Sequence, residues 1–209
     1  MGKRVRKKWT LVWGQGASLV ILGGLFLLGG AAGGIFAGLA QEEGALELGD
    51  YLSGYLSLAA AGSVERPFLP LMWEQLRYLL AAAVLGLTAI GVVGLPLLFC
   101  IRGFFFCFSV GCFFRVFGGA GLLPALVLFG MPALVWAPGF FLAGTQGLRN
   151  AYGLLRRVLG EGRYELPASQ PAYWARMGLC CVLFLICGAL EYGVLPVLLR
   201  AAARVVLSL

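Results

Sequence analysis

The chain has 209 residues, of which 61% are hydrophobic and only 12% are charged, and its mean hydropathy is +0.93. Because a soluble domain carries about 25% charged residues, this composition excludes a soluble fold and favours an integral membrane protein. The formal net charge is +7. Its basic residues gather at the ends of apolar segments instead of along one polar face, which indicates membrane topology and argues against nucleic acid as a partner.

The residue types that carry most catalytic and metal chemistry are scarce. Histidine is absent, and all six cysteines lie inside apolar runs without the spacing of a metal or redox site. The sequence contains no phosphate-binding loop, no dinucleotide-binding glycine pattern and no paired carboxylates of a hydrolase. We therefore expect a protein that is not an enzyme and needs no cofactor and no metal.

The first apolar segment follows a basic tail. Residues 1–10 carry five positive charges, no negative charge and Trp9, which predicts a cytoplasmic tail at a membrane boundary. Residues 11–40 hold no charge and would measure about 45 Å as a helix, more than the hydrocarbon core of about 30 Å, so this first span should tilt or protrude. The alternative is a signal peptide cleaved after Ala40, but the apolar run is about twice the usual length.

Residues 41–74 form the longest polar interruption and are expected to lie outside the cell membrane, because five acidic residues accompany a single arginine up to position 73. Apolar residues recur within it at helical spacing, which predicts a short amphipathic helix. This helix could lie on the outer membrane surface, on a partner, or over its own bundle. The predicted partner-binding residues are Leu48, Tyr51, Leu52, Tyr55 and Leu56.

The remaining sequence predicts further spans, for about five transmembrane helices in a single all-α, polytopic membrane domain. These spans are expected over residues 75–99, 103–117, 122–147 and 177–199. The third would reach only about 22 Å, so it must draw in flanking residues, thin the bilayer or re-enter the same side. The fourth contains Pro124, Pro132 and Pro138 and is expected to be kinked and buried in the bundle.

Charge asymmetry orients the spans. Residues 149–176 hold five arginines against two glutamates, which predicts a cytoplasmic loop. Five crossings from a cytoplasmic N-terminus place both basic clusters inside and the acidic loop outside, so the charge pattern and the crossing count agree. Arg200 and Arg204 in the tail argue mildly for the opposite orientation.

Small residues form two helix faces. In the first span, glycines four residues apart, deepened by Gly29 and Gly33, form a ridge on which another helix can approach closely. The members of this ridge are Gly30, Gly34 and Gly38. It predicts either packing within the chain or the face of a homodimer. A comparable face on the third span consists of Gly103, Cys107 and Gly111.

Glu191 is the one acidic residue well inside a predicted span. A charge at mid-bilayer costs about 2.5 to 3.5 kcal/mol on insertion scales, so this carboxylate should face the bundle and have a partner. The sequence predicts a structural ion pair with Arg115 or Arg77. A transport or proton site is the alternative.

Several short segments follow one another in the order and spacing of a known family. They are the basic N-terminus, the glycine-rich stretch 29–38, Tyr51-Leu52-Ser53, the run from Gly94-Leu95-Pro96 to Arg102-Gly103, Phe108-Ser109-Val110-Gly111, and Glu191 to Pro196. With these segments the chain resembles stage II sporulation protein M of endospore-forming bacteria over nearly its whole length. Cys107 stands where that family has glycine.

The resemblance implies a non-catalytic scaffold in the mother-cell septal membrane. It would recruit or position peptidoglycan-degrading enzymes during engulfment in endospore formation, with stage II sporulation proteins D and P as partners. The alternative function is a transporter-type permease subunit partnered by a separate ATPase or an ion gradient. Glu191 and the proline-rich fourth segment favour this alternative, whereas the scarcity of other polar residues inside the spans argues against it.

Overall fold

The computed structural model describes residues 2–39, 42–62, 67–160 and 169–207, and all regular elements in this part of the chain are helices. The long ones are α1 (Gly2–Leu39), α2 (Glu42–Ala61), α3 (Phe68–Gly86), α4 (Gly91–Phe117), α6 (Met131–Val158), α7 (Pro171–Gly193) and α8 (Leu195–Leu207). Three short elements connect α4 to α6: a 3-10 turn, η1 (Gly118–Gly121), then α5 (Leu122–Ala125), then a π-helical turn, η2 (Leu126–Gly130). The predicted all-α fold is confirmed.

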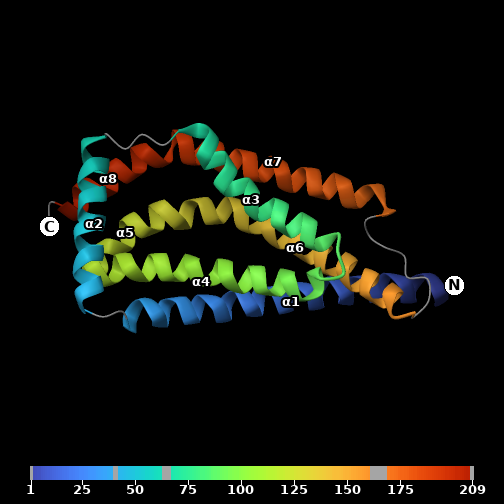
Figure 1. The fold of residues 1–209 in the computed structure, drawn as a ribbon. Helices are drawn as coiled ribbons and strands as arrows, with labels where there is room; N and C mark the ends of the chain where they lie inside the picture. Colours follow the sequence, from blue (N-terminus) through green and yellow to red (C-terminus); the bar gives the residue numbers. More distant parts are fainter. Residues whose placement is uncertain (1, 40–41, 63–66, 161–168, 208–209) are drawn as a thin grey trace.

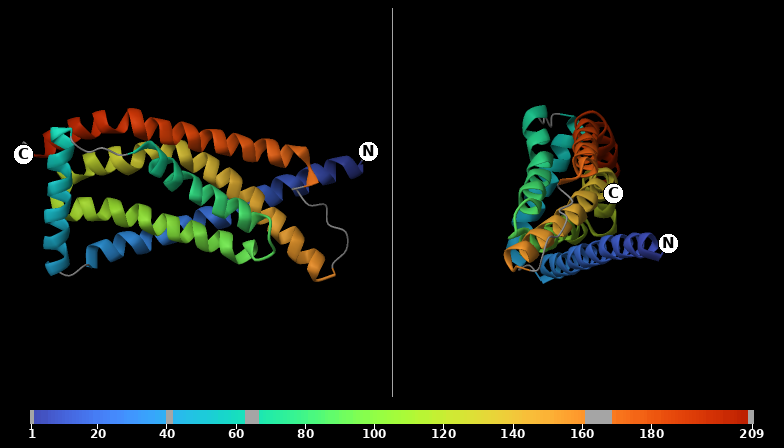
Figure 2. Two further views of the ribbon diagram at one scale, coloured as in Figure 1. Left: turned by 45° about the horizontal axis from the view of Figure 1, so that its top comes forward. Right: turned by 90° about the vertical axis from the view of Figure 1, so that its right-hand side faces the viewer.

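The long helices form an elongated bundle (Figure 1). Helices α1, α3, α4, α6 and α7 run lengthwise, α2 lies across one end, and α8 continues α7 towards that end. Figure 2 shows the same crosswise position of α2 from a second direction. We call this the α2 end; the start of α1 and the start of α7 lie at the opposite end. Since α2 packs on α8 and α4, it closes the α2 end of the bundle.

Four stretches of the described chain are long and apolar enough to cross a membrane, which makes the protein a polytopic membrane protein. They are Gly16–Leu39, Phe68–Gly86, Gly91–Val158 and Pro171–Gly193. The third is 68 residues long and folds back at η1, where Gly118 has φ of 58°, so α4 and α6 run in opposite directions (Figure 1). The total of five crossings stays a prediction. Residue 40 and residues 161–168 of the predicted cytoplasmic loop lie outside the described part.

The predicted boundary between the second and third spans is wrong. The chain turns at residues 87–90, and α4 begins at Gly91 and has 27 residues, so the third span is long because it takes in residues assigned to the second. The Thr88 hydroxyl donates to the Leu85 carbonyl at 3.0 Å, and a Cβ on Gly91 would lie 2.7 Å from the Leu85 carbonyl carbon. Because this turn contains no charged residue, apolar patterning did not reveal it. Arg102 therefore lies within α4, not at a membrane boundary.

The last two predicted spans also have different bounds. The proline-rich segment is irregular as expected, with η1, α5 and η2 preceding α6, and Pro138 lies inside α6. Helix α6 continues to Val158, past the predicted end at 147. The final predicted span breaks after Gly193, and Pro196 is the second residue of α8, a position where proline's missing N–H removes no helical hydrogen bond.

Glycines bring α1 and α4 into close contact. A Cβ on Gly29 would lie 2.8 Å from the Cys100 carbonyl carbon, and a Cβ on Gly33 would lie 2.9 Å from that of Phe104. Reciprocally, a Cβ on Gly103 would lie 2.9 Å from the Phe26 carbonyl carbon. The two backbones thus touch directly, and α1 and α4 form the most extensive helix pair in the bundle.

Only part of the predicted glycine ridge takes part in this packing. Gly30 lies under the Cys107 thiol, which fills the space above it. Gly34 and Gly38 are exposed, and a Cβ added to either would meet nothing within 4 Å. Packing within the chain accounts for Gly29, Gly30 and Gly33. A homodimer through Gly34 and Gly38 stays a prediction.

The buried apolar side chains form two clusters along the bundle. The larger includes Phe99, Trp136, Phe140 and Phe184, with the Phe99 and Phe140 rings stacked at 4.2 Å. The smaller lies at the α2 end and is built by α2, α4, α5, η2 and α8 around Leu56, Phe113 and Leu199. Polar side chains lie between the two clusters.

Candidate functional site

The predicted amphipathic helix is present as α2, but most of the predicted partner-binding residues pack on the chain itself. Leu52 is 7% exposed and Leu56 is fully buried in the smaller core cluster. Leu48 and Tyr55 are partly buried against the same cluster, whereas Tyr51 is 72% exposed. The apolar face of α2 therefore lies over its own bundle, and Tyr51 is the one of the five that is mostly exposed.

The opposite side of α2 is a second candidate surface, and Tyr51 is its one member that apolar periodicity singled out. Its exposed members, which we call the α2 exposed face, are Glu47, Asp50, Tyr51, Gly54, Ser57 and Leu58. Leu58 is 55% exposed, and the Ser53 and Ser57 hydroxyls donate to backbone carbonyls of their own helix. The face thus combines two carboxylates with one aromatic and one aliphatic side chain. In the sequence, this face corresponds to the positions of α2 that lie between the buried apolar residues.

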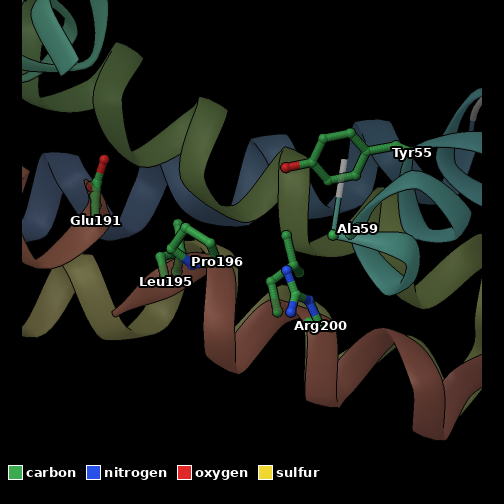
Figure 3. A pocket seen from close by; sticks show the side chains of 8 residues that line it. Tyr55, Ala59, Glu191, Leu195, Pro196 and Arg200 are labelled. Carbon is green, nitrogen blue, oxygen red and sulfur yellow. The ribbon is translucent and has the colours of Figure 1, made fainter. Parts of the chain in front are cut away.

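Helix α8 fixes the last turn of α2. Gly62, which follows α2 at φ of 79°, approaches the Arg200 side chain so closely that a Cβ would lie 2.6 Å from Arg200 Cζ. A guanidinium at a helix C-terminus complements the partial negative charge of the free carbonyl groups. Figure 3 shows Tyr55 and Ala59 of α2 facing Leu195, Pro196 and Arg200 across a small pocket that Glu191 also lines.

Next to this pocket, a larger cavity of about 330 Å³ lies between the two core clusters. Residues of α2, α3, α4, η2, α6 and α7 line it. Its polar and charged lining includes Tyr55, Glu74, Gln75, Arg102, Ser109 and Glu191. Aromatic side chains of α4 and α6, among them Phe105, Phe106 and Trp136, form much of the remaining wall. This combination of polar anchors with an apolar wall is typical of a ligand site.

Glu191 faces this cavity. Gln75 Nε2 donates a hydrogen bond to Glu191 Oε1, and the Cys187 thiol lies 3.8 Å from the same oxygen. Arg115 instead donates to the Ala37 carbonyl at 3.1 Å and to the Gly38 carbonyl, at the end of α1. These contacts give Glu191 and Arg115 different partners, so they do not support the predicted ion pair, which stays a prediction.

Arg102 is the arginine that shares the cavity with Glu191, and sequence reasoning did not assign it to a site. Its guanidinium carbon lies 4.1 Å from the centre of the Tyr78 ring and 4.6 Å from that of Trp136. Cation–π contacts of this kind stabilise a charge that is withdrawn from water. The available signal was an arginine in the middle of an apolar helix of 27 residues whose other charged residue, Arg115, lies in the last turn, once the boundaries of α4 are known.

Comparison with known proteins places the chain in a family. Neither the curated proteins nor the solved structures gave a match. The family described as Stage II sporulation protein M matches residues 20–194, which include α2 and every residue that lines the larger cavity. Because the match covers most of the chain, this sporulation-related membrane protein belongs to the stage II sporulation protein M family.

Proposed function

We propose that the protein is a non-catalytic scaffold of the mother-cell septal membrane, which holds peptidoglycan-degrading enzymes at the α2 end during engulfment. The observation that carries the proposal is the position of α2, which lies across the end of the bundle with Leu52 and Leu56 buried beneath it. A docking helix fixed in this way has little conformational freedom to lose on binding, which favours affinity. Stage II sporulation proteins D and P are the partners that family membership suggests.

The α2 exposed face has the chemistry of a protein contact. Tyrosine is enriched among the residues that dominate interface energetics, and Tyr51 stands out from the helix at 72% exposure. Glu47 and Asp50 are exposed beside it, so a complementary partner would offer basic side chains around an apolar pocket. Leu58, two turns further along α2, extends the apolar part of the contact.

The test replaces both apolar members of this face. Tyr51→Ser combined with Leu58→Ser should lower co-purification of the two enzymes from membranes of sporulating cells by about tenfold or more, because loss of an interface anchor costs about 2 kcal/mol. The amount of protein in the membrane should not change, since both side chains are exposed. Tyr152→Ser is the matched control, because Tyr152 is a half-exposed tyrosine on α6, away from α2. Unchanged recovery with the double variant would contradict the scaffold role of α2.

A permease subunit is the second candidate, and the larger cavity beside the π-helical turn η2 favours it. Helices broken within the membrane and ionisable residues facing a cavity recur at transport sites. Recovery of an ATPase in fixed proportion to the chain, together with solute flux that Glu191→Gln abolishes, would support this candidate. Enzyme recovery that depends on Tyr51 and Leu58 would support the scaffold.

A further inference from the structure

The larger cavity is elongated along α4. Arg102, Phe106, Ser109 and Phe113 line it at intervals of four, three and four residues, which places them on one face of the helix over about 17 Å. At its other end Tyr51 and Tyr55 of α2 also line it, so the cavity extends from the interior of the bundle to the α2 end. Phe105 in the wall is 53% exposed, so the lining continues onto the outer surface of the bundle.

Two polar groups of the cavity, Gln75 and Arg102, lie deep between the helices. Gln75 precedes the end of α3 by 11 residues, and Arg102 follows the start of α4 by 11 residues. At 1.5 Å per residue, both lie about 17 Å from the turn at residues 87–90, near the middle of a hydrocarbon core of about 30 Å. Charges at this depth are retained where they serve a function.

The guanidinium N–H groups of Arg102 can bind an anion. The rings of Tyr78 and Trp136 cover the guanidinium, and the Tyr78 side chain accepts a hydrogen bond from it, which leaves further N–H groups of its five for a ligand. Glu191 attracts the charge of Arg102, and both side chains line the cavity. A phosphate group matches the planar guanidinium and binds it through paired hydrogen bonds.

The other polar groups of the cavity are acceptors, which suit a positively charged hydrogen-bond donor. Gln75 is 7% exposed, and while its Nε2 donates to Glu191, its Oε1 has no partner. Glu74 and Glu191 add two carboxylates to the same cavity. A primary ammonium has three N–H donors for these acceptors, whereas a quaternary ammonium has none.

We infer that this cavity binds the headgroup of a zwitterionic phospholipid, with its phosphate on Arg102 and its primary ammonium on Gln75 and Glu191. The aromatic wall receives the start of the acyl chains, and the opening towards the α2 end gives access from the leaflet on that side. Phosphatidylethanolamine has both groups. Phosphatidylglycerol lacks the ammonium, and phosphatidylcholine lacks the N–H donors.

The test measures lipid binding to the purified full chain in detergent by native mass spectrometry, with dioleoyl forms of the three lipids. Phosphatidylethanolamine should bind about tenfold more tightly than either of the others. Glu191→Gln should abolish this preference, whereas Arg102→Met should weaken binding of all three lipids, because all three carry the phosphate. Arg77→Met is the matched control, because Arg77 is an exposed arginine of α3 that does not line the cavity. Ser109→Phe, which fills the cavity and removes no charge, should weaken phosphatidylethanolamine binding as Arg102→Met does.

Three results would overturn the inference. The first is equal affinity of the unaltered protein for the three lipids. The second is a Glu191→Gln variant that keeps the preference, an Arg77→Met variant that weakens binding as much as Arg102→Met, or a Ser109→Phe variant that binds phosphatidylethanolamine as tightly as the unaltered protein. The third is free phosphoethanolamine bound as tightly as the lipid, since the acyl chains would then contribute nothing.

Discussion

At the scale of single residues, the Gln75–Glu191 contact joins α3 to the end of α7. Replacing either side chain by an apolar one leaves the other polar group without this partner. An unsatisfied polar group inside a membrane bundle lowers the free energy of unfolding by about 1 to 3 kcal/mol. We expect Glu191→Leu to lower the free energy of unfolding by about that amount in detergent, measured by thermal or denaturant unfolding. Gln75→Leu with Glu191→Leu should cost less than the sum of the single changes. Additive effects would show that the contact is not coupled.

Gly62 and Gly160 form a natural pair for testing the Arg200 contact. Both have positive φ, 79° and 78°, but a Cβ on Gly62 would displace Arg200, whereas a Cβ on Gly160 would meet nothing within 4 Å. Alanine at either position should be strained by the backbone alone, at about 1 kcal/mol. Gly62→Ala should therefore lower the unfolding free energy more than Gly160→Ala. Replacing Arg200 by Ala should remove that difference; a difference that persists would exclude the Arg200 contact as its cause.

At the scale of elements, the α1–α4 contact depends on which glycines of α1 face α4. Gly33→Ala inserts a methyl group against the Phe104 carbonyl and should lower the unfolding free energy by about 1 to 3 kcal/mol. Gly34→Ala, one residue further along, meets open space and should be neutral or stabilising, since alanine is the better helix former. Thermal unfolding in detergent should therefore show a lower melting temperature for Gly33→Ala than for Gly34→Ala.

Leucine substitutions at two exposed glycines of α1 test the homodimer. A dimer that uses Gly34 and Gly38 would be disrupted by Gly34→Leu, so its molecular mass in detergent should halve while Gly24→Leu leaves it unchanged. Gly24 is also exposed with nothing within 4 Å of an added Cβ. An unchanged mass with Gly34→Leu would show that this part of the ridge does not hold two copies together.

At the scale of the whole molecule, the orientation in the membrane is expected to follow the charge asymmetry, with the α2 end outside. Asp50 and Leu159 are exposed and lie on α2 and just beyond α6. In a chain whose native cysteines are replaced, a membrane-impermeant maleimide applied to intact cells should label Asp50→Cys and spare Leu159→Cys. Labelling of Leu159→Cys alone would reverse the topology.

The sequence alone was enough for the fold class, the amphipathic helix α2 and the family. Composition indicates a membrane protein, because 61% hydrophobic residues cannot be buried in a soluble domain of this length. Periodicity located α2, since a helix with one buried face repeats apolar residues every three to four positions. Collinear motifs led to the stage II sporulation protein M family, which matches residues 20–194.

Only the tertiary structure decided where helices break and what each apolar face meets. The turn at 87–90 is made by a Thr88 hydrogen bond and a close approach at Gly91, neither of which changes hydropathy. Apolar spacing on α2 is the same whether the face meets a partner or its own bundle, so the burial of Leu52 and Leu56 had to be observed. Arg102 and Glu191, 89 positions apart in sequence, share a cavity because α4 and α7 pack into the same bundle, and such long-range proximity leaves no local pattern.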